Sequence, residues 1–350
     1  MAYTTIDKST AQFNTKLYTG NASTLNVTGV GFQPDWVWIK SRGGAGSHNL
    51  FDAVRGVQKR IFTDLTSAEQ TSATYLTAFG SDGFTLGNNG DVNGNNQTTV
   101  AWNWKANGAG SSNTDGSLAS TVSVNSTARF SIVKYLGNGN AATIGHGLGV
   151  VPKMIILKNL NTSDSWYVYH QGMGANAYMH INTNNGALSP STNQFQATTP
   201  TNSVFYVGNA EGTGGNGRNM IAYCFADVEG YSKFGKYTGN GSSSGDGSFI
   251  YTGFKPSFLM VKRTNGAKDW HIFDTARSTS NVVKSQLEPN TSNAETTSSN
   301  WVDMLSNGFK WRIASGDGEY GDVNGDGDTY IYMAIGQSLV GSNGVTAKAR

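Results

Sequence analysis

The chain has 350 residues, enough for two or three domains, and its net charge of +2 excludes a strong electrostatic pull toward nucleic acid or an anionic membrane. Charged residues make up only 14% of the chain, whereas 45 glycines and many Ser, Thr and Asn residues are typical of short strands joined by tight turns. No stretch approaches the roughly 18 apolar residues of a membrane-spanning helix, and the single cysteine excludes an intrachain disulfide.

The N-terminal segment lacks the basic start and apolar core of a signal peptide, which predicts synthesis in a host cytoplasm. Residues 1–12 are polar apart from the isolated Tyr3 and Ile6. We expect them to form an arm that is ordered only where it packs on a neighbour.

From residue 13 onward the chain repeats one pattern three times. Each copy opens with a strand that ends in the motif Tyr-x-Gly-Asn, whose tyrosine is Tyr18, Tyr135 or Tyr237. The spacing is about 100 residues, which is the size of a β-sandwich domain and too long for a solenoid unit.

A central strand follows in each copy. Pro34, Pro152 and Pro256 are each followed by one polar residue, four apolar residues and a lysine. A proline is suited to the start of a strand, and a run of apolar residues without alternation predicts a strand covered on both faces. The lysines, namely Lys40, Lys158 and Lys262, are expected to return the chain to water.

A second, aromatic strand comes next, at 48–52, 166–170 and 270–274. In copies one and three it leads into Asp-x-x-Arg, which is Asp52 with Arg55 and Asp274 with Arg277, whereas copy two has His170 and Met173. The pattern favours a structural ion pair. The alternative, a catalytic acid beside an anion clamp, would need a third group.

Each copy then has a variable polar segment, such as 67–71 or 292–296, where surface loops diverge and binding usually takes place. A turn and an apolar closing strand complete the copy.

We therefore predict an all-β chain of three tandem antiparallel β-sandwich domains of jelly-roll or lectin-like type. The predicted divisions are an arm (1–12), repeat 1 (13–106), a Gly/Ser/Asn-rich linker (107–128), repeat 2 (129–229), repeat 3 (230–340) and a polar tail (341–350). The shorter connection between repeats 2 and 3 predicts that these two are more tightly coupled than repeats 1 and 2.

The one candidate metal site is a calcium loop formed by Asp322, Asn324, Asp326 and Asp328. Oxygen ligands at alternate positions with a glycine at position six begin like an EF-hand loop, but position twelve is Met333 instead of glutamate. The sequence favours a hairpin turn rich in turn-forming residues, so no cofactor is expected apart from a possible Ca²⁺.

No catalytic residue is assigned. The five histidines lack ligand spacing, and no nucleophile elbow or phosphate loop is present. Cys224 lies in an apolar run that favours a buried, inert thiol. Trp36, Trp38, Trp102 and Trp104 could stack on sugars, but their apolar strands favour a core role.

Taken together, Tyr-Thr-Gly-Asn, Gly-Phe-x-Pro-Asp-x-Val-Trp-Ile-Lys, Phe-Asp-x-x-Arg-Gly, Ser-Asp-Gly-Phe and the closing strand at 100–105 form a specific set of motifs. The set resembles a repeat domain in virion proteins of tailed bacteriophages, especially phages of marine bacteria and cyanobacteria (cyanophages), and it covers the chain from Tyr3 to Ile335. The resemblance implies lectin-like sandwiches in a tail-fibre or decoration protein, and it implies no catalytic residues.

We therefore expect a non-enzymatic structural protein on the surface of the phage particle, in the tail-fibre or attachment apparatus. Its partners would be other virion proteins, further copies of itself and, as a candidate ligand, a host glycan, with no nucleic acid and no membrane insertion. The alternatives are a capsid decoration protein (head fibre or cement), a glycan-binding module, or a polysaccharide depolymerase with paired carboxylates in one repeat only.

Overall fold

The computed structural model describes residues 4–314 and 319–338, and these residues form mainly antiparallel β-sheet. The all-β prediction is thus confirmed, while the polar tail at 341–350 lies outside the described residues. Among the described residues, no helix is both long and apolar enough to cross a membrane.

Repeat 1 has a six-stranded sheet in the order β1-β9-β3-β4-β5-β6 and a three-stranded sheet in the order β2-β8-β7. Its elements, with the preceding short helix η1, are η1 (Ser9–Ala11), β1 (Phe13–Thr19), β2 (Leu25–Thr28), β3 (Trp36–Ser41), β4 (Asn49–Asp52), β5 (Lys59–Phe62), β6 (Gln70–Thr71), β7 (Leu76–Gly80), β8 (Gly83–Leu86), α1 (Gly90–Asn93) and β9 (Thr98–Trp104).

Repeat 2 has a six-stranded sheet in the order β10-β11-β12-β17-β14-β15 and a two-stranded sheet, β13-β16. Its elements are β10 (Ser111–Asn113), β11 (Ser120–Asn125), β12 (Phe130–Leu136), β13 (Ala142–Gly145), β14 (Met154–Asn159), β15 (Trp166–His170), η2 (Gln171–Met173), α2 (Thr192–Phe195), β16 (Val204–Val207), α3 (Glu211–Gly214) and β17 (Asn219–Phe225).

Repeat 3 has a four-stranded sheet in the order β18-β24-β20-β21 and a three-stranded sheet in the order β19-β23-β22. Its elements are β18 (Ser232–Thr238), β19 (Phe249–Tyr251), β20 (Phe254–Arg263), β21 (His271–Asp274), β22 (Val302–Leu305), β23 (Gly308–Trp311), α4 (Tyr320–Val323) and β24 (Thr329–Ser338).

The same four strands stand side by side in every repeat: the opening strand, the closing strand, the central strand and the aromatic strand. Their registers also agree, because Trp36 pairs with Trp104, Met154 with Phe225 and Phe258 with Ile335. These pairs define equivalent positions in the three repeats. The central strands β3 and β14 are buried along their whole length, as their unbroken apolar runs predict. Pro256 lies inside β20, next to an irregularity in the pairing, where its missing N–H is tolerated.

Each repeat has two layers with their own apolar core. In repeat 1, for example, Val27 and Phe84 of the small sheet pack with Val37, Ile39 and Phe51 of the large sheet. Repeats 2 and 3 contain corresponding clusters.

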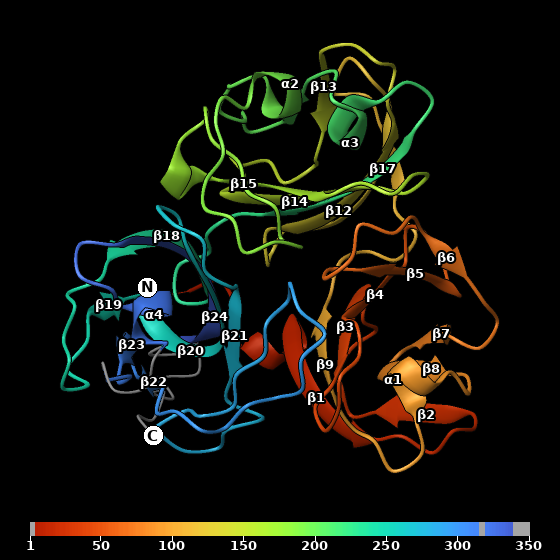
Figure 1. Cartoon of the computed structure of the whole chain (residues 1–350). Coiled ribbons are helices and arrows are strands. Elements are labelled where there is room, and N and C mark those ends of the chain that lie inside the picture. The colour runs from red at the N-terminus through yellow and green to blue at the C-terminus, as the bar shows by residue number, and fades with distance from the viewer. Residues whose placement is uncertain (1–3, 315–318, 339–350) are drawn as a thin grey trace.

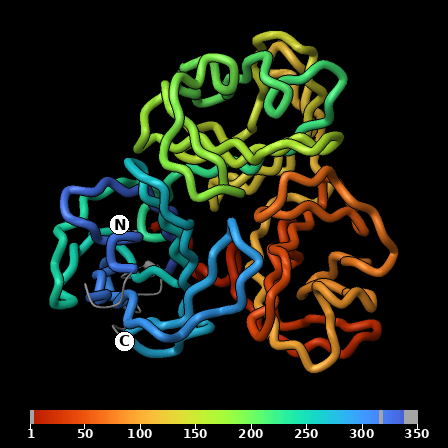
Figure 2. The backbone as a smooth tube through the Cα atoms, in the orientation of Figure 1, coloured from red at the N-terminus to blue at the C-terminus, as the bar shows by residue number. Residues whose placement is uncertain are grey.

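A further core lies between the repeats, on the opposite face of each large sheet. One cluster of buried residues includes Trp36, Trp102 and Trp104 of repeat 1, Phe130, Met154, Tyr223 and Phe225 of repeat 2, and Phe234, Phe258 and Met260 of repeat 3. Trp36 stacks on Tyr223 with 4.5 Å between ring centroids, and Phe13 meets Phe258 at 5.5 Å. The three repeats therefore form a closed triangle, which the chain traverses once (Figures 1 and 2).

This arrangement changes the expectation about the linker. Part of the predicted linker forms β10 and β11, and β11 pairs with β12 along its whole length. All three repeats contribute to one core, while the tighter coupling of repeats 2 and 3 stays a prediction. Ile6 of the N-terminal arm is 4% exposed within that core, so the arm is anchored by its apolar side chain.

The Tyr-x-Gly-Asn motif fixes the short helix that precedes each closing strand. The hydroxyls of Tyr18, Tyr135 and Tyr237 donate to the carbonyls of Val92, Thr213 and Val323, at 2.6, 2.5 and 2.6 Å. The motif's glycine lets the backbones approach, because a Cβ at Gly20 would lie 2.2 Å from the Gly94 oxygen. The bond from the tyrosine hydroxyl to a carbonyl of this helix therefore explains why the motif occurs in all three repeats.

Replacing Tyr135 with Phe should lower the free energy of unfolding by about 1–3 kcal/mol, because the buried Thr213 carbonyl loses its donor. Urea denaturation measures the change. Tyr206→Phe is the matched control, since the Tyr206 hydroxyl has no hydrogen-bond partner in the described part of the chain. Equal losses in the two variants would contradict the assigned role.

Candidate functional site

Two clusters of buried charged groups lie where the repeats meet. At the end of β4, the Asp52 carboxylate pairs with Arg55 and accepts a hydrogen bond from the Tyr223 hydroxyl of repeat 2 at 2.8 Å. Arg55 also donates to the Leu50 carbonyl and to Glu69, at 3.0 and 3.1 Å. Burial opposes the Arg55 charge, but the Asp52 carboxylate and its neighbours outweigh it and raise the pKa of the guanidinium. This network joins repeats 1 and 2.

Repeats 3 and 1 are joined in the same way. Asp274 pairs with Arg277 and accepts a hydrogen bond from Trp102 Nε1 at 2.9 Å. Arg277 donates to the Ile272 carbonyl at 2.9 Å and to Glu295 at 3.0 Å. Each aspartate thus accepts a donor from the closing strand of another repeat, and that donor stands at the equivalent position, two residues before Trp104 or Phe225.

The interface between repeats 2 and 3 explains why copy two lacks Asp-x-x-Arg. The position equivalent to Trp102 and Tyr223 is Met333 in repeat 3, and methionine donates no hydrogen bond. In place of the aspartate stands His170, whose Nε2 lies 3.2 Å from the Tyr332 carbonyl. Burial lowers the pKa of His170 to about 4, so the ring is neutral at pH 7. At this interface the neutral His170 replaces the aspartate, and the apolar Met333 replaces the hydrogen-bond donor.

The three lysines at the ends of the central strands are buried, contrary to the expectation that they return the chain to water. Lys40, Lys158 and Lys262 are each 0% exposed. Their ammonium groups donate to the carbonyls of Ser292, Thr66 and Asn184, at 3.3, 3.1 and 3.2 Å. Each of these three acceptors belongs to a different repeat from its lysine, while Lys158 and Lys262 also donate to carbonyls of their own repeats. Backbone carbonyls, including one from a neighbouring repeat, therefore replace the water that each lysine gives up.

The loops that receive these lysines include the polar segments that the sequence marked as possible binding loops. The Glu69 amide donates to the Leu160 carbonyl at 3.0 Å, and the Glu295 amide donates to the Arg42 carbonyl at 3.0 Å. Tryptophans of the aromatic strands add further bonds, from Trp166 to the Phe62 carbonyl at 2.6 Å and from Trp270 to the His180 carbonyl at 3.1 Å. These loops contact other repeats of the same chain. Figure 2 shows one loop of repeat 3 extending toward repeat 1.

The buried carboxylates are consequently engaged in structure. The structural interpretation of Asp-x-x-Arg accounts for the side-chain hydrogen bonds of Asp52 and Asp274 within residues 4–314 and 319–338. The acids nearest to each pair, Glu69 and Glu295, are themselves bonded to its arginine. Trp36, Trp38, Trp102 and Trp104 are at most 2% exposed, which confirms their core role.

The four calcium candidates turn toward separate partners. Asp322, in α4, lies 2.6 Å from Lys268 Nζ and 3.5 Å from His271 Nε2, and Asp328 pairs with Arg263 at 2.7 Å. The Asn324 amide bonds to Asn240, and Asp326 lies beside Gly241. In the described ranges, no three His, Cys, Asp or Glu side chains form a group that could hold a metal ion. The geometry favours a turn stabilised by ion pairs.

Cys224 is 0% exposed, as its apolar run predicts, and burial raises the pKa of its thiol. The thiol is therefore protonated at neutral pH and unsuited to nucleophilic attack.

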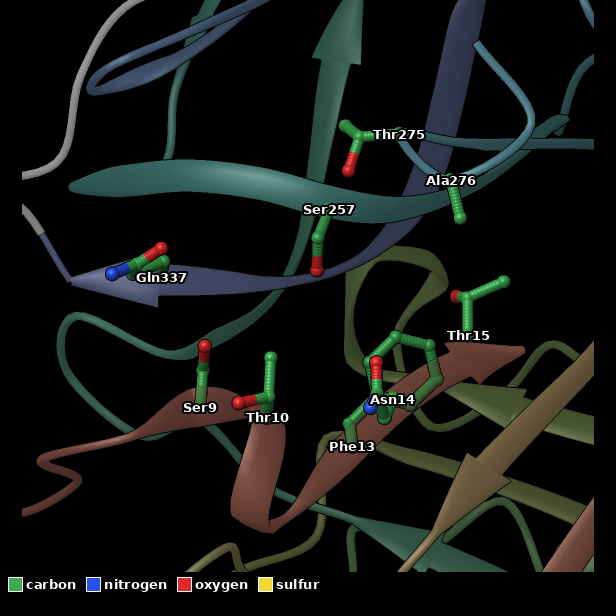
Figure 3. A pocket seen from close by; sticks show the side chains of 9 residues that line it. All are labelled: Ser9, Thr10, Phe13, Asn14, Thr15, Ser257, Thr275, Ala276 and Gln337. Atoms are coloured by element: carbon green, nitrogen blue, oxygen red, sulfur yellow. The ribbon is translucent and has the colours of Figure 1, made fainter. Parts of the chain in front are cut away.

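A cavity of about 200 Å³ opens between repeats 1 and 3 (Figure 3). One wall consists of Ser9, Thr10 and residues 13–15, and the other of Ser257, Thr275, Ala276 and Gln337. None of these lining side chains is an acid or a base at neutral pH, so the cavity can offer hydrogen bonds but no general acid–base chemistry.

We predict that His170→Asp lowers the free energy of unfolding by about 3–5 kcal/mol, because it buries a carboxylate against the Tyr332 carbonyl, and both groups only accept hydrogen bonds. Adding Met173→Arg should recover at least about 1 kcal/mol, since it restores the Asp-x-x-Arg spacing of repeats 1 and 3. Chemical denaturation of the two single variants and the double variant measures this coupling. If the effects of the two substitutions simply add, no ion pair forms between the new side chains, which would contradict the prediction.

We also predict that the free energy of unfolding rises between about pH 7 and pH 9. Burial lowers the pKa of Lys40 and Lys158 to about 8 and that of Lys262 to about 7, from 10.5. The unfolded chain therefore binds more protons than the folded chain in this range, so raising the pH favours the fold. Above it, buried tyrosines and Cys224 with raised pKa values act in the opposite direction.

The control for this pH effect is Lys262→Met, which should show a smaller rise than the parent chain over the same range. Urea denaturation at three pH values gives both curves. Parallel curves would contradict the contribution of Lys262.

Comparison with known proteins finds one family model, described as a domain of unknown function (DUF7483), which matches residues 8–338. Searches of curated proteins and of solved structures give no match. The matched segment begins just before η1 and ends with β24, so it contains all three repeats and their shared core. The chain therefore belongs to the DUF7483 family.

Proposed function

We propose that this chain is a non-enzymatic structural protein of a bacteriophage particle, located on the particle surface in the tail-fibre or attachment apparatus. Its repeats would be three antiparallel β-sandwiches of jelly-roll or lectin-like type. Its partners would be other virion proteins, further copies of itself and a host-surface glycan. The resemblance of the repeat motifs to phage virion proteins supports this assignment.

The observation that carries the proposal is the closure of three repeats on one core. The sheets share an aromatic cluster, and lysines from each repeat bind loop carbonyls of another. Such a block resists local opening because no repeat can leave without exposing its aromatic face to water. Resistance of this kind suits a particle that persists outside a cell.

The disposition of the titratable groups speaks against a depolymerase. Paired carboxylates in one repeat would be needed for that reaction. The buried aspartates of repeats 1 and 3 instead occupy equivalent positions and are paired with arginine in the same way. Repetition of the same pair is expected of a structural element.

A capsid decoration protein is the second candidate, because the described residues form a compact triangle without a shaft (Figure 1). A decoration protein needs a stable block that sits on a surface, whereas a fibre needs an elongated part.

Immunogold electron microscopy with antibodies against the purified chain tests both candidates on virions of the phage that encodes it. Label at the tail or its fibres is the expected result. Label over the head would favour the decoration role, and the absence of label from purified virions would contradict the proposal.

A further inference from the structure

A second cavity, of about 400 Å³, lies where repeats 2 and 3 are joined. Its walls are Arg129, residues 227–230 between β17 and β18, Ser232 and Lys233 at the start of β18, and Tyr251 with the two residues that follow it. This volume falls within the range of small-ligand pockets.

Tyr251 of β19 is an exposed aromatic residue. It is 54% exposed, and Phe249 on the same strand is 47% exposed. The neighbouring Ile250 pairs with Phe309, as Val27 pairs with Phe84 and Ile144 with Phe205.

These pairings place Thr28 and Gly145 at the position of Tyr251, and Asn26 and Thr143 at the position of Phe249. Repeats 1 and 2 thus form the same small-sheet pairing with small or polar residues at both positions. The aromatic ring at the cavity is a feature of repeat 3 alone.

Polar groups line the cavity together with this ring. Asp227 Oδ1 accepts a hydrogen bond from the Phe234 amide at 2.9 Å, and Arg129 donates to the Asp227 carbonyl at 2.7 Å. Lys233 Nζ lies 5.6 Å from the centre of the Tyr251 ring. The cavity therefore offers a carboxylate acceptor and an ammonium donor next to an aromatic face.

The charges of these groups balance. Arg129 and Lys233 are positive, while Asp227 and Glu229 are negative, so the cavity gives no net preference for a charged ligand. A sugar ring fits this combination, because its C–H face packs on an aromatic ring and its hydroxyls both donate and accept hydrogen bonds.

We propose that this cavity binds a sugar unit of a neutral glycan, with the ring of the sugar against Tyr251 and its hydroxyls on Asp227 and Lys233. This inference deepens the proposed attachment role and rests on it for its biological meaning. It assigns the glycan contact to one junction of the triangle.

The test uses the intact chain and four probes: the methyl glycosides of glucose, galactose, mannose and N-acetylglucosamine. Saturation-transfer NMR and calorimetric titration should detect binding of at least one probe, with a dissociation constant on the order of 1 mM. Tyr251→Thr, which introduces the residue of repeat 1, should weaken that binding about tenfold. Asp227→Asn should weaken it as well, while it keeps Oδ1 as acceptor for the Phe234 amide.

Phe249→Asn is the matched control. It removes the other exposed aromatic residue of β19, which does not line the cavity, and it introduces the residue of repeat 1. This variant should bind as the parent chain does. Binding unaffected by Tyr251→Thr, equal loss in both aromatic variants, or no binding of any probe by the folded chain would overturn the inference. None of these results would alter where antibodies label the virion, so the attachment role stands or falls separately.

Discussion

Trp36 of repeat 1 stacks on Tyr223 of repeat 2 in a core to which all three repeats contribute. Each large sheet is apolar on both faces, with one face turned to the small sheet of its own repeat and the other to its two neighbours. A repeat by itself would leave the second face in water. Since burial of each large apolar side chain contributes about 1.5–3 kcal/mol, the repeats depend on one another for a substantial part of their stability.

Polar contacts at the edges of this core determine which surfaces meet. Apolar packing alone would tolerate several arrangements of three similar sheets, whereas a buried charge requires its own partner. Asp52 accepts a hydrogen bond from Tyr223, Asp274 accepts one from Trp102, and His170 lies against the strand that carries Met333. The interfaces differ in chemistry, so each repeat fits one place in the triangle. The cavity at Tyr251 shows the same principle at the surface, where one repeat carries a residue that its equivalents lack.

Much of the fold could be predicted from the sequence because the relevant signals are local. Proline followed by an apolar run marks the central strands, and Tyr-x-Gly-Asn marks the ends of the opening strands. The burial of Lys158 could not be predicted in this way, because its acceptor at Thr66 comes from another repeat. The strand at 111–113 carries no signal, because Ser-Ser-Asn has no apolar residue. The strand at 120–125 does carry one, the alternation of Val122 and Val124 with polar residues, but the Gly-, Ser- and Asn-rich sequence before it favours a linker. The shared core did leave a signal, namely central strands without alternation, but a second covering layer within the same domain would give that signal too. The cavity at Tyr251 had no motif, and only the alignment of the repeats by strand register singles it out.

Scanning calorimetry of the intact chain tests the central claim that the three repeats form one cooperative unit. The shared core predicts a single transition in which the calorimetric and van't Hoff enthalpies agree, with a ratio of about 1. Two or three resolved transitions, or a ratio of about 3, would show that the repeats unfold independently and would contradict the claim.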